Sequence, residues 1–220
     1  MADTNQNELF NDNTVYILDS YGLIYRAYFA LFSHPLTNTK GENISALVIF
    51  FKNFLSLLSK YKPRYVAAAF DSRTPTFRHM MYKEYKATRQ KTPDDLHAQV
   101  PWIENVLNAL GIPVLRVDGF EADDVIATFA RKCEEKKINC RILSGDKDLM
   151  QLVTDTCFMM KPDKSSGGWE TCNADGVLAE WGVPPEKMLD MLGIFHLSQQ
   201  ISSLPSLTIY KEILAFENRT

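Results

Sequence analysis

Carboxylate side chains are concentrated in two short stretches of this 220-residue chain. The first contains Glu121, Asp123 and Asp124, and the second contains Asp146 and Asp148. Each stretch stands beside an apolar segment that we expect to be buried. Carboxylates near a core need a compensating cation, and hard divalent ions prefer oxygen ligands. The two stretches therefore indicate a metal site for phosphate chemistry.

Short apolar runs precede these acids and two others. Asp19 and Asp71 directly follow the first two runs, and the two acidic stretches follow the last two. Ligands bind at the carboxyl edge of an open parallel sheet, so four acidic positions at strand ends favour one shared site. The four expected strands are residues 15–18, 65–70, 112–115 and 139–143.

Helical patterns alternate with these strands. This alternation predicts an α/β fold with a mostly parallel central sheet flanked by helices. The helix that starts at Thr92 is expected to use that residue as its N-cap, with Pro93 at the first helical position. Residues 156–161 are expected to form an edge strand. The expected helices cover residues 20–32, 44–61, 92–110, 122–132, 148–153, 173–181 and 184–192.

Each acidic motif also has a purely structural interpretation. Acids at a helix start complement its dipole, and Gly-Asp sequences are common in turns. However, Glu121 and Asp124 are three residues apart and share one helical face. Two such carboxylates repel each other unless a cation lies between them. Together with Asp19 and Asp71, the pattern favours a cluster that holds two ions roughly 4 Å apart.

A basic and aromatic segment lies between the second and third strands. The net charge of −3 argues against nucleic-acid binding, but the cations are concentrated locally, with Glu84 as the sole acid among residues 78–91. Cations can hold phosphates and aromatic rings can stack on bases, whereas ordinary surface helices mix both signs. If the segment is helical, one side carries Arg78, Tyr82, Lys86 (or Tyr85) and Arg89.

Other features narrow the class of protein. The four cysteines form no C-x-x-C pair, so we expect reduced thiols in a cytosolic protein. No apolar run approaches the length of a membrane span, and residues 1–13 are expected to form a flexible leader without a signal sequence. The scattered histidines and the tryptophans are interpreted as surface or packing residues.

The motifs in this order resemble the 5′-nuclease (flap endonuclease) family, in particular the N-terminal 5′–3′ exonuclease domain of bacterial DNA polymerase I. The resemblance covers about residues 14–193 and implies a PIN-like core with a helical arch at about residues 72–91. The matching segments are Leu18-Asp19-Ser20, Tyr25-Arg26-Ala27, Phe70-Asp71, Phe77-Arg78, Tyr85-Lys86-Ala87-Thr88-Arg89, Pro93-Asp94-Asp95-Leu96, Glu121-Ala122-Asp123-Asp124, Gly145-Asp146-Lys147-Asp148-Leu149 and Gly182-Val183-Pro184-Pro185.

The resemblance implies a divalent-metal-dependent phosphodiesterase that acts on DNA with a free 5′ end, flap or nick. It implies Mg²⁺ or Mn²⁺, two ions, no organic cofactor and no membrane, in a bacterial cytoplasmic protein for which a monomer is favoured. The residues matching metal positions are Asp19, Asp71, Glu121, Asp123, Asp124, Asp146 and Asp148. Arg78 and Lys86 are also implied to be catalytic, and the implied DNA contacts are Arg26, Arg78, Tyr82, Lys83, Tyr85, Lys86 and Arg89.

The chain departs from the family pattern near Gly193. The family continues with an aspartate pair and a helix-hairpin-helix that binds duplex DNA, but here no acid occurs between Asp190 and Glu212. We therefore expect residues 194–220 to be a divergent tail of a truncated product. The second metal site would then be impaired, and activity would be weak or lost.

Two other function classes remain open. The chain could be a catalytically inert nucleic-acid-binding remnant, or a PIN-like ribonuclease, although such ribonucleases usually lack the long basic arch. A haloacid-dehalogenase-like phosphatase is disfavoured, because that family needs a second aspartate two residues after its nucleophile, and Asp19 is followed by Ser20 and Tyr21.

Overall fold

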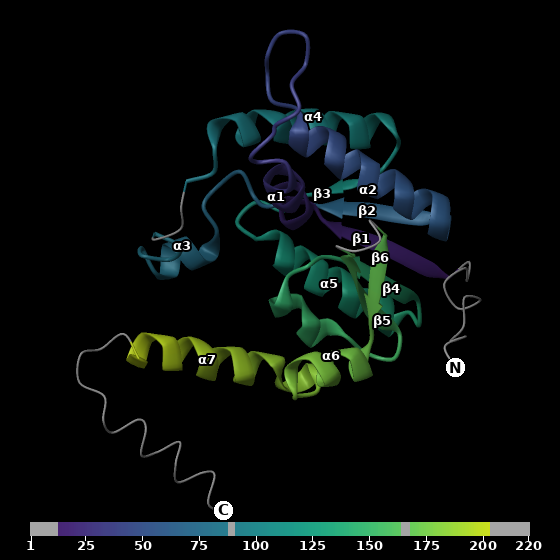
Figure 1. The fold of residues 1–220 in the computed structure, drawn as a ribbon. Helices are drawn as coiled ribbons and strands as arrows, with labels where there is room; N and C mark the ends of the chain where they lie inside the picture. Colours follow the sequence, from purple (N-terminus) through teal and green to yellow (C-terminus); the bar gives the residue numbers. More distant parts are fainter. Residues whose placement is uncertain (1–12, 88–90, 164–167, 203–220) are drawn as a thin grey trace, which may run out of the picture.

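A mostly parallel sheet forms the centre of the protein, with helices on both faces (Figure 1). The computed structural model describes residues 13–87, 91–163 and 168–202. The strand order is β3-β2-β1-β4-β5-β6, and only the β5–β6 pair is antiparallel. The strands are β1 (Thr14–Asp19), β2 (Tyr65–Ala69), β3 (Val114–Leu115), β4 (Asn139–Leu143), β5 (Cys157–Pro162) and β6 (Trp169–Cys172). The predicted α/β class is confirmed.

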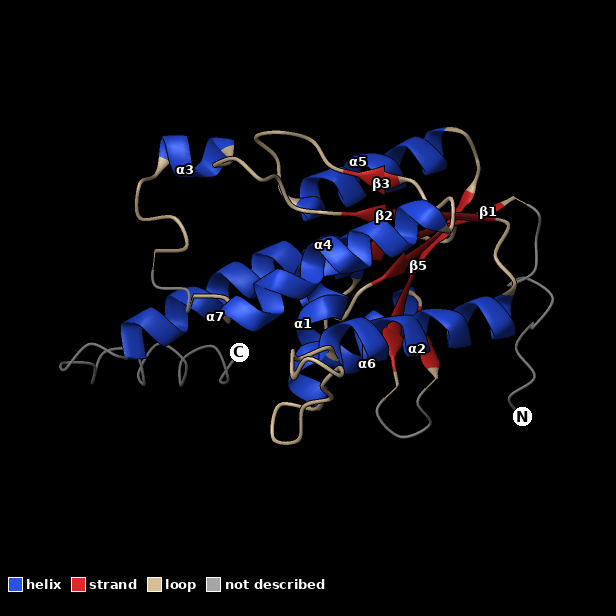
Figure 2. Ribbon diagram, turned by 90° about the horizontal axis from the view of Figure 1, so that it is seen from above, coloured by secondary structure: helices blue, strands red, loops and turns tan. Residues whose placement is uncertain are grey.

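The helices divide between the two faces of the sheet, as Figure 1 shows. Those on one face are α1 (Ser20–Ala30), α2 (Ser45–Tyr61) and α4 (Asp94–Ala109). Those on the other are α5 (Ala122–Glu135), the 3₁₀ helices η2 (Lys147–Leu152) and η3 (Pro185–Lys187), α6 (Ala174–Trp181) and α7 (Met188–Ser202). The short helix α3 (Phe77–Met81) lies apart from both layers, as Figure 2 shows from above, beyond the carboxyl ends of the strands.

Alternation along the central strand builds both cores. Tyr16 and Leu18 of β1 face the α1/α2/α4 layer, whereas Ile17 faces α5, and all three are buried. A strand covered on both faces must be apolar on both, which explains why β1 is a continuous apolar run. The register places Asp19 opposite Ala69 of β2, and Leu18 opposite Leu143 of β4. The ends of three neighbouring strands therefore lie level at one edge.

Two local predictions were wrong. The helix α4 begins at Asp94, with Pro93 as its N-cap and no side-chain cap, because the Thr92 hydroxyl instead hydrogen-bonds the Tyr25 hydroxyl. The strand expected at residues 156–161 is not an edge, because β5 pairs with β4 on one side and with β6 on the other. The Trp169 indole of β6 donates to the Asn53 carbonyl at 3.2 Å and ties that strand to α2.

The helix in the basic segment is too short to place the predicted cations on one side. Helix α3 ends at Met81, and Tyr82 adopts an extended conformation with φ −141° and ψ 106°. Lys86 has a φ of 57°, in the left-handed region. Arg78, Tyr82 and Lys86 therefore do not follow one helical stripe, and Arg89 lies outside the described residues.

Helix α7 extends further than predicted. It continues past Leu192 and Gly193 to Ser202, so the departure from the family pattern does not coincide with a break in secondary structure. The Phe195 ring lies 5.6 Å from the Lys147 ammonium of η2. Among the described residues, no helix combines the length and apolar character needed to cross a bilayer.

Two leucines of α2 provide a matched test of the core between the sheet and the layer of α1, α2 and α4. Leu57 is fully buried, whereas Leu55 is 57% exposed. We expect Leu57→Ala to lower the free energy of unfolding by about 2–5 kcal/mol, because it removes buried methyl groups and leaves a cavity. Leu55→Ala should change it by less than about 0.5 kcal/mol. Urea denaturation measures both values, and similar losses for the two variants would contradict this packing.

Candidate metal and active site

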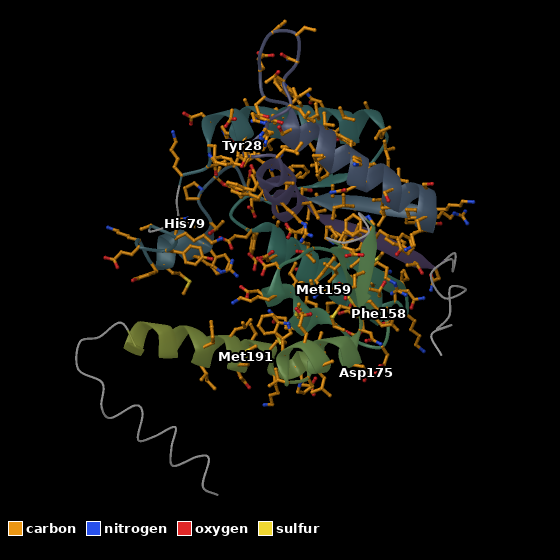
Figure 3. All side chains as sticks on the ribbon, viewed as in Figure 1. Tyr28, His79, Phe158, Met159, Asp175 and Met191 are labelled. Atoms are coloured by element: carbon orange, nitrogen blue, oxygen red, sulfur yellow. The ribbon has the colours of Figure 1, made fainter. Side chains whose placement is uncertain are left out.

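Acidic residues from four separate segments line one cleft of about 640 Å³ at the carboxyl edge of the sheet. Helix α3 lies on this side of the molecule, where His79 is labelled in Figure 3, whereas the labelled Asp175 of α6 lies away from it. The cleft-lining acids are Asp19, Asp71, Glu121, Asp123, Asp146 and Asp148. Six of the seven predicted metal-ligating residues therefore share this cleft, and Asp124 does not line it.

Asp19 is the most deeply placed of these acids, with 5% exposure. Its Oδ2 accepts a hydrogen bond from the Ser144 hydroxyl at 2.6 Å, and its Oδ1 accepts from the Gly22 amide at 3.1 Å. Burial raises the pKa of Asp19, and the two hydrogen bonds oppose that rise. A Cβ at Gly22 would lie 2.4 Å from Oδ2, so only glycine fits beside this carboxylate.

Ser144 is a site residue that the sequence analysis missed. It is fully buried, donates to Asp19, and accepts from the Asp146 amide at 2.9 Å. It therefore holds the ends of β1 and β4 in register. Two sequence signals could have found this pair of contacts: a serine directly after a buried strand, and a glycine inside the helical pattern at residue 22.

Asp71 joins the end of β2 to the start of α5. Its Oδ1 accepts from the Ala122 amide at 2.7 Å, and its carbonyl oxygen accepts from Arg116 Nε at 3.0 Å. The amides at a helix start lack partners within the helix, so a carboxylate is stabilised there. Asp146 caps η2 in the same way, because its Oδ1 accepts from the Asp148 amide at 2.9 Å.

The carboxyl group of Asp123 is partly buried among other carboxylates of the cleft, and this raises its pKa. Burial and then the charges of Asp19, Asp146 and Asp71 raise the pKa of Asp123 to about 7. Lys86 opposes this rise. A cation inside the cleft would relieve the repulsion, which is the condition under which carboxylates bind divalent ions.

The cations of the arch contact carboxylates at the start of α5. Lys86 Nζ lies 3.0 Å from Glu121 Oε1, and the Tyr85 hydroxyl donates to Glu121 Oε2 at 3.2 Å. Arg78 makes two hydrogen bonds to Asp124, of 2.7 and 2.8 Å, and lies 3.7 Å from Glu121. The cation expected between Glu121 and Asp124 is therefore, in this structure, the guanidinium of Arg78.

Other predicted DNA contacts are more dispersed. Arg26 donates to the Pro162 carbonyl at 2.6 Å and lines a hollow of about 430 Å³ that shares Asp19 and Asp146 with the cleft. Tyr82 is 58% exposed and donates to Glu84 at 2.9 Å. Lys83 is exposed within the arch segment.

The donor set of the cleft fits a hard divalent ion in its chemistry. All six acids offer oxygen, and oxygen is what Mg²⁺ and Mn²⁺ prefer. Within the described residues, no three Asp, Glu, His or Cys side chains are gathered closely enough to hold an ion together. Mg²⁺ keeps several water molecules and is commonly held by one or two carboxylates, so this spacing is compatible with it.

Comparison with known proteins identifies the family. A family model described as "5'-3' exonuclease, N-terminal resolvase-like domain" matches residues 14–182. The chain belongs to the 5′–3′ exonuclease family. Its relatives in this family include DNA polymerase I of Treponema pallidum, which is 49% identical over 181 residues that cover 82% of this chain and 18% of the relative. The 5′-3′ exonuclease of Aquifex aeolicus is 37% identical over 194 residues, covering 88% of this chain and 64% of that protein.

The chain matches only part of the length of each of these relatives. The chain spans about a fifth of the length of the polymerase and just under two thirds of the length of the exonuclease. The resemblance stated from the sequence motifs is confirmed at the level of the 5′–3′ exonuclease family found in DNA polymerase I.

Solved structures of exonuclease relatives show the same fold. The T5 5′-exonuclease with bound zinc has a TM-score of 0.58 and 21% identity, covering 80% of this chain and 64% of that chain. The bacteriophage T5 D15 flap endonuclease in a complex with DNA and metal ions has a TM-score of 0.58 and 20% identity, covering 80% of this chain and 63% of that chain. The first structure contains divalent metal ions, and the second contains DNA and metal ions.

The raised pKa of Asp123 predicts a stability change with pH in the metal-free protein. Between its ordinary value of 3.8 and about 7, Asp123 is protonated in the folded state and ionised in the unfolded state. The folded state then binds more protons, so its stability falls as the pH rises through this range. Asp123→Asn should therefore raise the metal-free Tm at pH 8 by about 3–6 °C, a gain on the order of 1–2 kcal/mol after solvent screening.

Differential scanning fluorimetry at pH 4 and pH 8 measures this difference. The gain should be small at pH 4, where Asp123 is protonated in the folded protein. Asp175→Asn, at an exposed position of α6, serves as the control and should show no such pH dependence. An equal gain for Asp123→Asn at both pH values would contradict the assigned repulsion.

Proposed function

We propose that this protein hydrolyses phosphodiester bonds at the 5′ ends and flaps of DNA in a reaction that depends on Mg²⁺ or Mn²⁺. The observation that carries the proposal is the gathering of six acids from four segments, Asp123 among them, in one cleft that Lys86 also lines. Such unrelieved negative charge beside a cation suits ions bound next to a phosphate. The physiological substrates would arise in primer removal and repair.

The proposed ligands are the cleft-lining acids Asp19, Asp71, Glu121, Asp123, Asp146 and Asp148. When bound, divalent ions at such a site activate water and neutralise charge on the phosphate. Ser144 and Gly22 hold the Asp19 carboxylate in place, and the Ala122 amide holds that of Asp71. The protein thereby fixes oxygen ligands before the substrate arrives.

Lys86 is proposed to contact the phosphate near the cut. It now pairs with Glu121, a proposed ligand, and its side chain is 37% exposed. An ion at Glu121 would compete with Lys86, and the ammonium could then turn to the phosphate. Tyr85 lines the same cleft and offers an aromatic face to a base.

A weaker second ion is part of the proposal. No acid occurs between Asp190 and Glu212, where the family pattern places an aspartate pair. We therefore expect slow cleavage, and a DNA affinity that falls steeply with salt. The same observation favours the second candidate, a nucleic-acid-binding protein without catalysis.

Cleavage of a labelled 5′-flap substrate by the purified protein tests the nuclease proposal. We expect slow product formation that requires Mg²⁺ or Mn²⁺. Asp146→Asn should reduce it by at least about 100-fold, because it removes a charge from the ion site. Asp175→Asn, at an exposed acid away from the cleft, should cleave like the wild-type protein.

The outcomes separate the candidates. Flap binding without cleavage in either ion would favour the inert binding protein. Faster cleavage of a matched RNA flap would favour a ribonuclease of the PIN-like group. Rapid Mg²⁺-dependent cleavage would support the nuclease but contradict the expected weakness of the second ion.

Lys86→Ala tests the proposed phosphate contact. Removing one Lys–phosphate contact should weaken DNA binding about equally for all sequences and reduce the slope of log K against log salt by roughly 0.9. Fluorescence anisotropy between 50 and 200 mM salt, about the usual range for such slopes, measures this. Lys52→Ala, at an exposed lysine of α2, is the charge-matched control. An equal slope for Lys86→Ala and the wild-type protein would contradict the contact.

A further inference from the structure

Asp124 is separated from the other acids by its contacts. Its Oδ1 accepts from Arg78 Nη2 at 2.8 Å, and its Oδ2 accepts from Arg78 Nη1 at 2.7 Å. Oδ2 also accepts from the Glu121 amide at 3.0 Å. Two parallel hydrogen bonds between guanidinium and carboxylate are the strong and directional form of this ion pair. Both oxygens of Asp124 are thus engaged by the protein itself.

Neighbouring positions on α5 direct Asp123 and Asp124 to different surroundings. Asp123 lines the cleft with Asp19, Asp71 and Asp146. Asp124 instead lines a separate groove of about 600 Å³, formed with apolar residues such as Phe77, Phe120 and Val125. Consecutive helical residues point about 100° apart, so one carboxylate can face the cluster while the next faces away.

The two neighbours also differ in the charges around them. Asp123 shares its cleft with Asp19, Asp71 and Asp146, whereas Asp124 receives two hydrogen bonds from the Arg78 guanidinium. Asp123 therefore has unrelieved repulsion that an ion would remove. Asp124 already has its counter-charge.

The guanidinium of Arg78 is held at the border of the cleft. It is fixed by Asp124, lies 3.7 Å from Glu121, and lies 4.6 Å from the centre of the Phe77 ring. Helix α3, which carries it, has only five residues and contains no buried residue. A long side chain on such a short helix needs a partner to define its direction, and the contact to Asp124 on α5 supplies one.

We propose that Asp124 is a positioning residue that fixes Arg78 beside Glu121 to receive a phosphate of the DNA strand, and that it does not ligate the metal ions. A guanidinium has five N–H donors and the Asp124 contact uses two, so others remain to contact a phosphate. The inference deepens the proposed nuclease function and rests on it. It also assigns Asp124 a role different from the one implied by the family resemblance.

The test compares two adjacent substitutions in the full chain. Asp124→Asn retains an oxygen that can accept from the Glu121 amide but loses the double contact to Arg78. Asp123→Asn removes a proposed ligand one position earlier. Mn²⁺ binding is measured by electron paramagnetic resonance, and binding of a 5′-flap DNA is measured by fluorescence anisotropy in Ca²⁺, a hard ion that takes the same oxygen ligands.

We expect Asp123→Asn to weaken Mn²⁺ binding about tenfold or more, whereas Asp124→Asn should leave it within about twofold of wild type. Asp124→Asn should instead weaken flap binding about tenfold, as should Arg78→Gln. The double variant should bind no more weakly than Arg78→Gln alone, because residues that act through one contact are not additive. Asp124→Glu, which restores the charge, should recover part of the DNA binding.

Either of two results would overturn the inference. The first is a loss of Mn²⁺ binding in Asp124→Asn equal to that in Asp123→Asn. The second is that the effects of Asp124→Asn and Arg78→Gln on flap binding multiply in the double variant. Circular dichroism melts check folding, and Asp124→Ser, which keeps an oxygen for the Glu121 amide but removes the carboxylate, replaces Asp124→Asn if the latter unfolds.

The design also separates failure of the inference from failure of the proposed function. If the wild-type protein binds Mn²⁺ and flap DNA without cleaving, the role of Asp124 is still tested while the nuclease proposal fails. A wild-type protein that binds neither Mn²⁺ nor flap DNA would overturn both.

Discussion

Repulsion among carboxylates at one edge of a parallel sheet is the constraint on which the rest of this structure depends. Parallel strands end at the same edge, so an acid after each strand is brought against its neighbours whether or not this stabilises the fold. Asp19 and Asp123 show the consequence, because burial and mutual charge raise the pKa of each. The fold keeps these acids together through Ser144, Gly22 and the amides at helix starts.

The arch relieves part of this charge at the rim of the cleft. Lys86 and Arg78 contact Glu121 and Asp124 at the start of α5, while Asp123 remains surrounded by carboxylates. The site is therefore divided into a neutralised rim and a negative interior. A cation would be favoured in the interior, and a phosphate would be favoured near the arch. This division suits the proposed binding of a metal ion and a polyanion side by side.

Sequence patterns were sufficient for the elements and for the cleft. The apolar runs before Asp19 and Asp71 and the alternation of strands and helices predicted the parallel sheet and the edge at which acids gather. They were insufficient where one tertiary contact decides the outcome. Thr92 bonds Tyr25 instead of capping α4, and the short β6 completes the sheet beyond β5. The helix of the arch ends at Met81, although the charge spacing suited a longer one.

The sequence by itself therefore determined the family, which acids follow which strands, and that the acids of the site offer oxygen ligands. These follow from sequence alone because periodicity and residue type are local properties. Only the tertiary structure decided how Asp123 and Asp124 differ. They are adjacent and chemically identical, and they occupy the same acidic motif. Their partners, Asp19 and Arg78, are brought to them from distant parts of the chain by packing of α5 against the sheet and the arch. No local pattern carries that information.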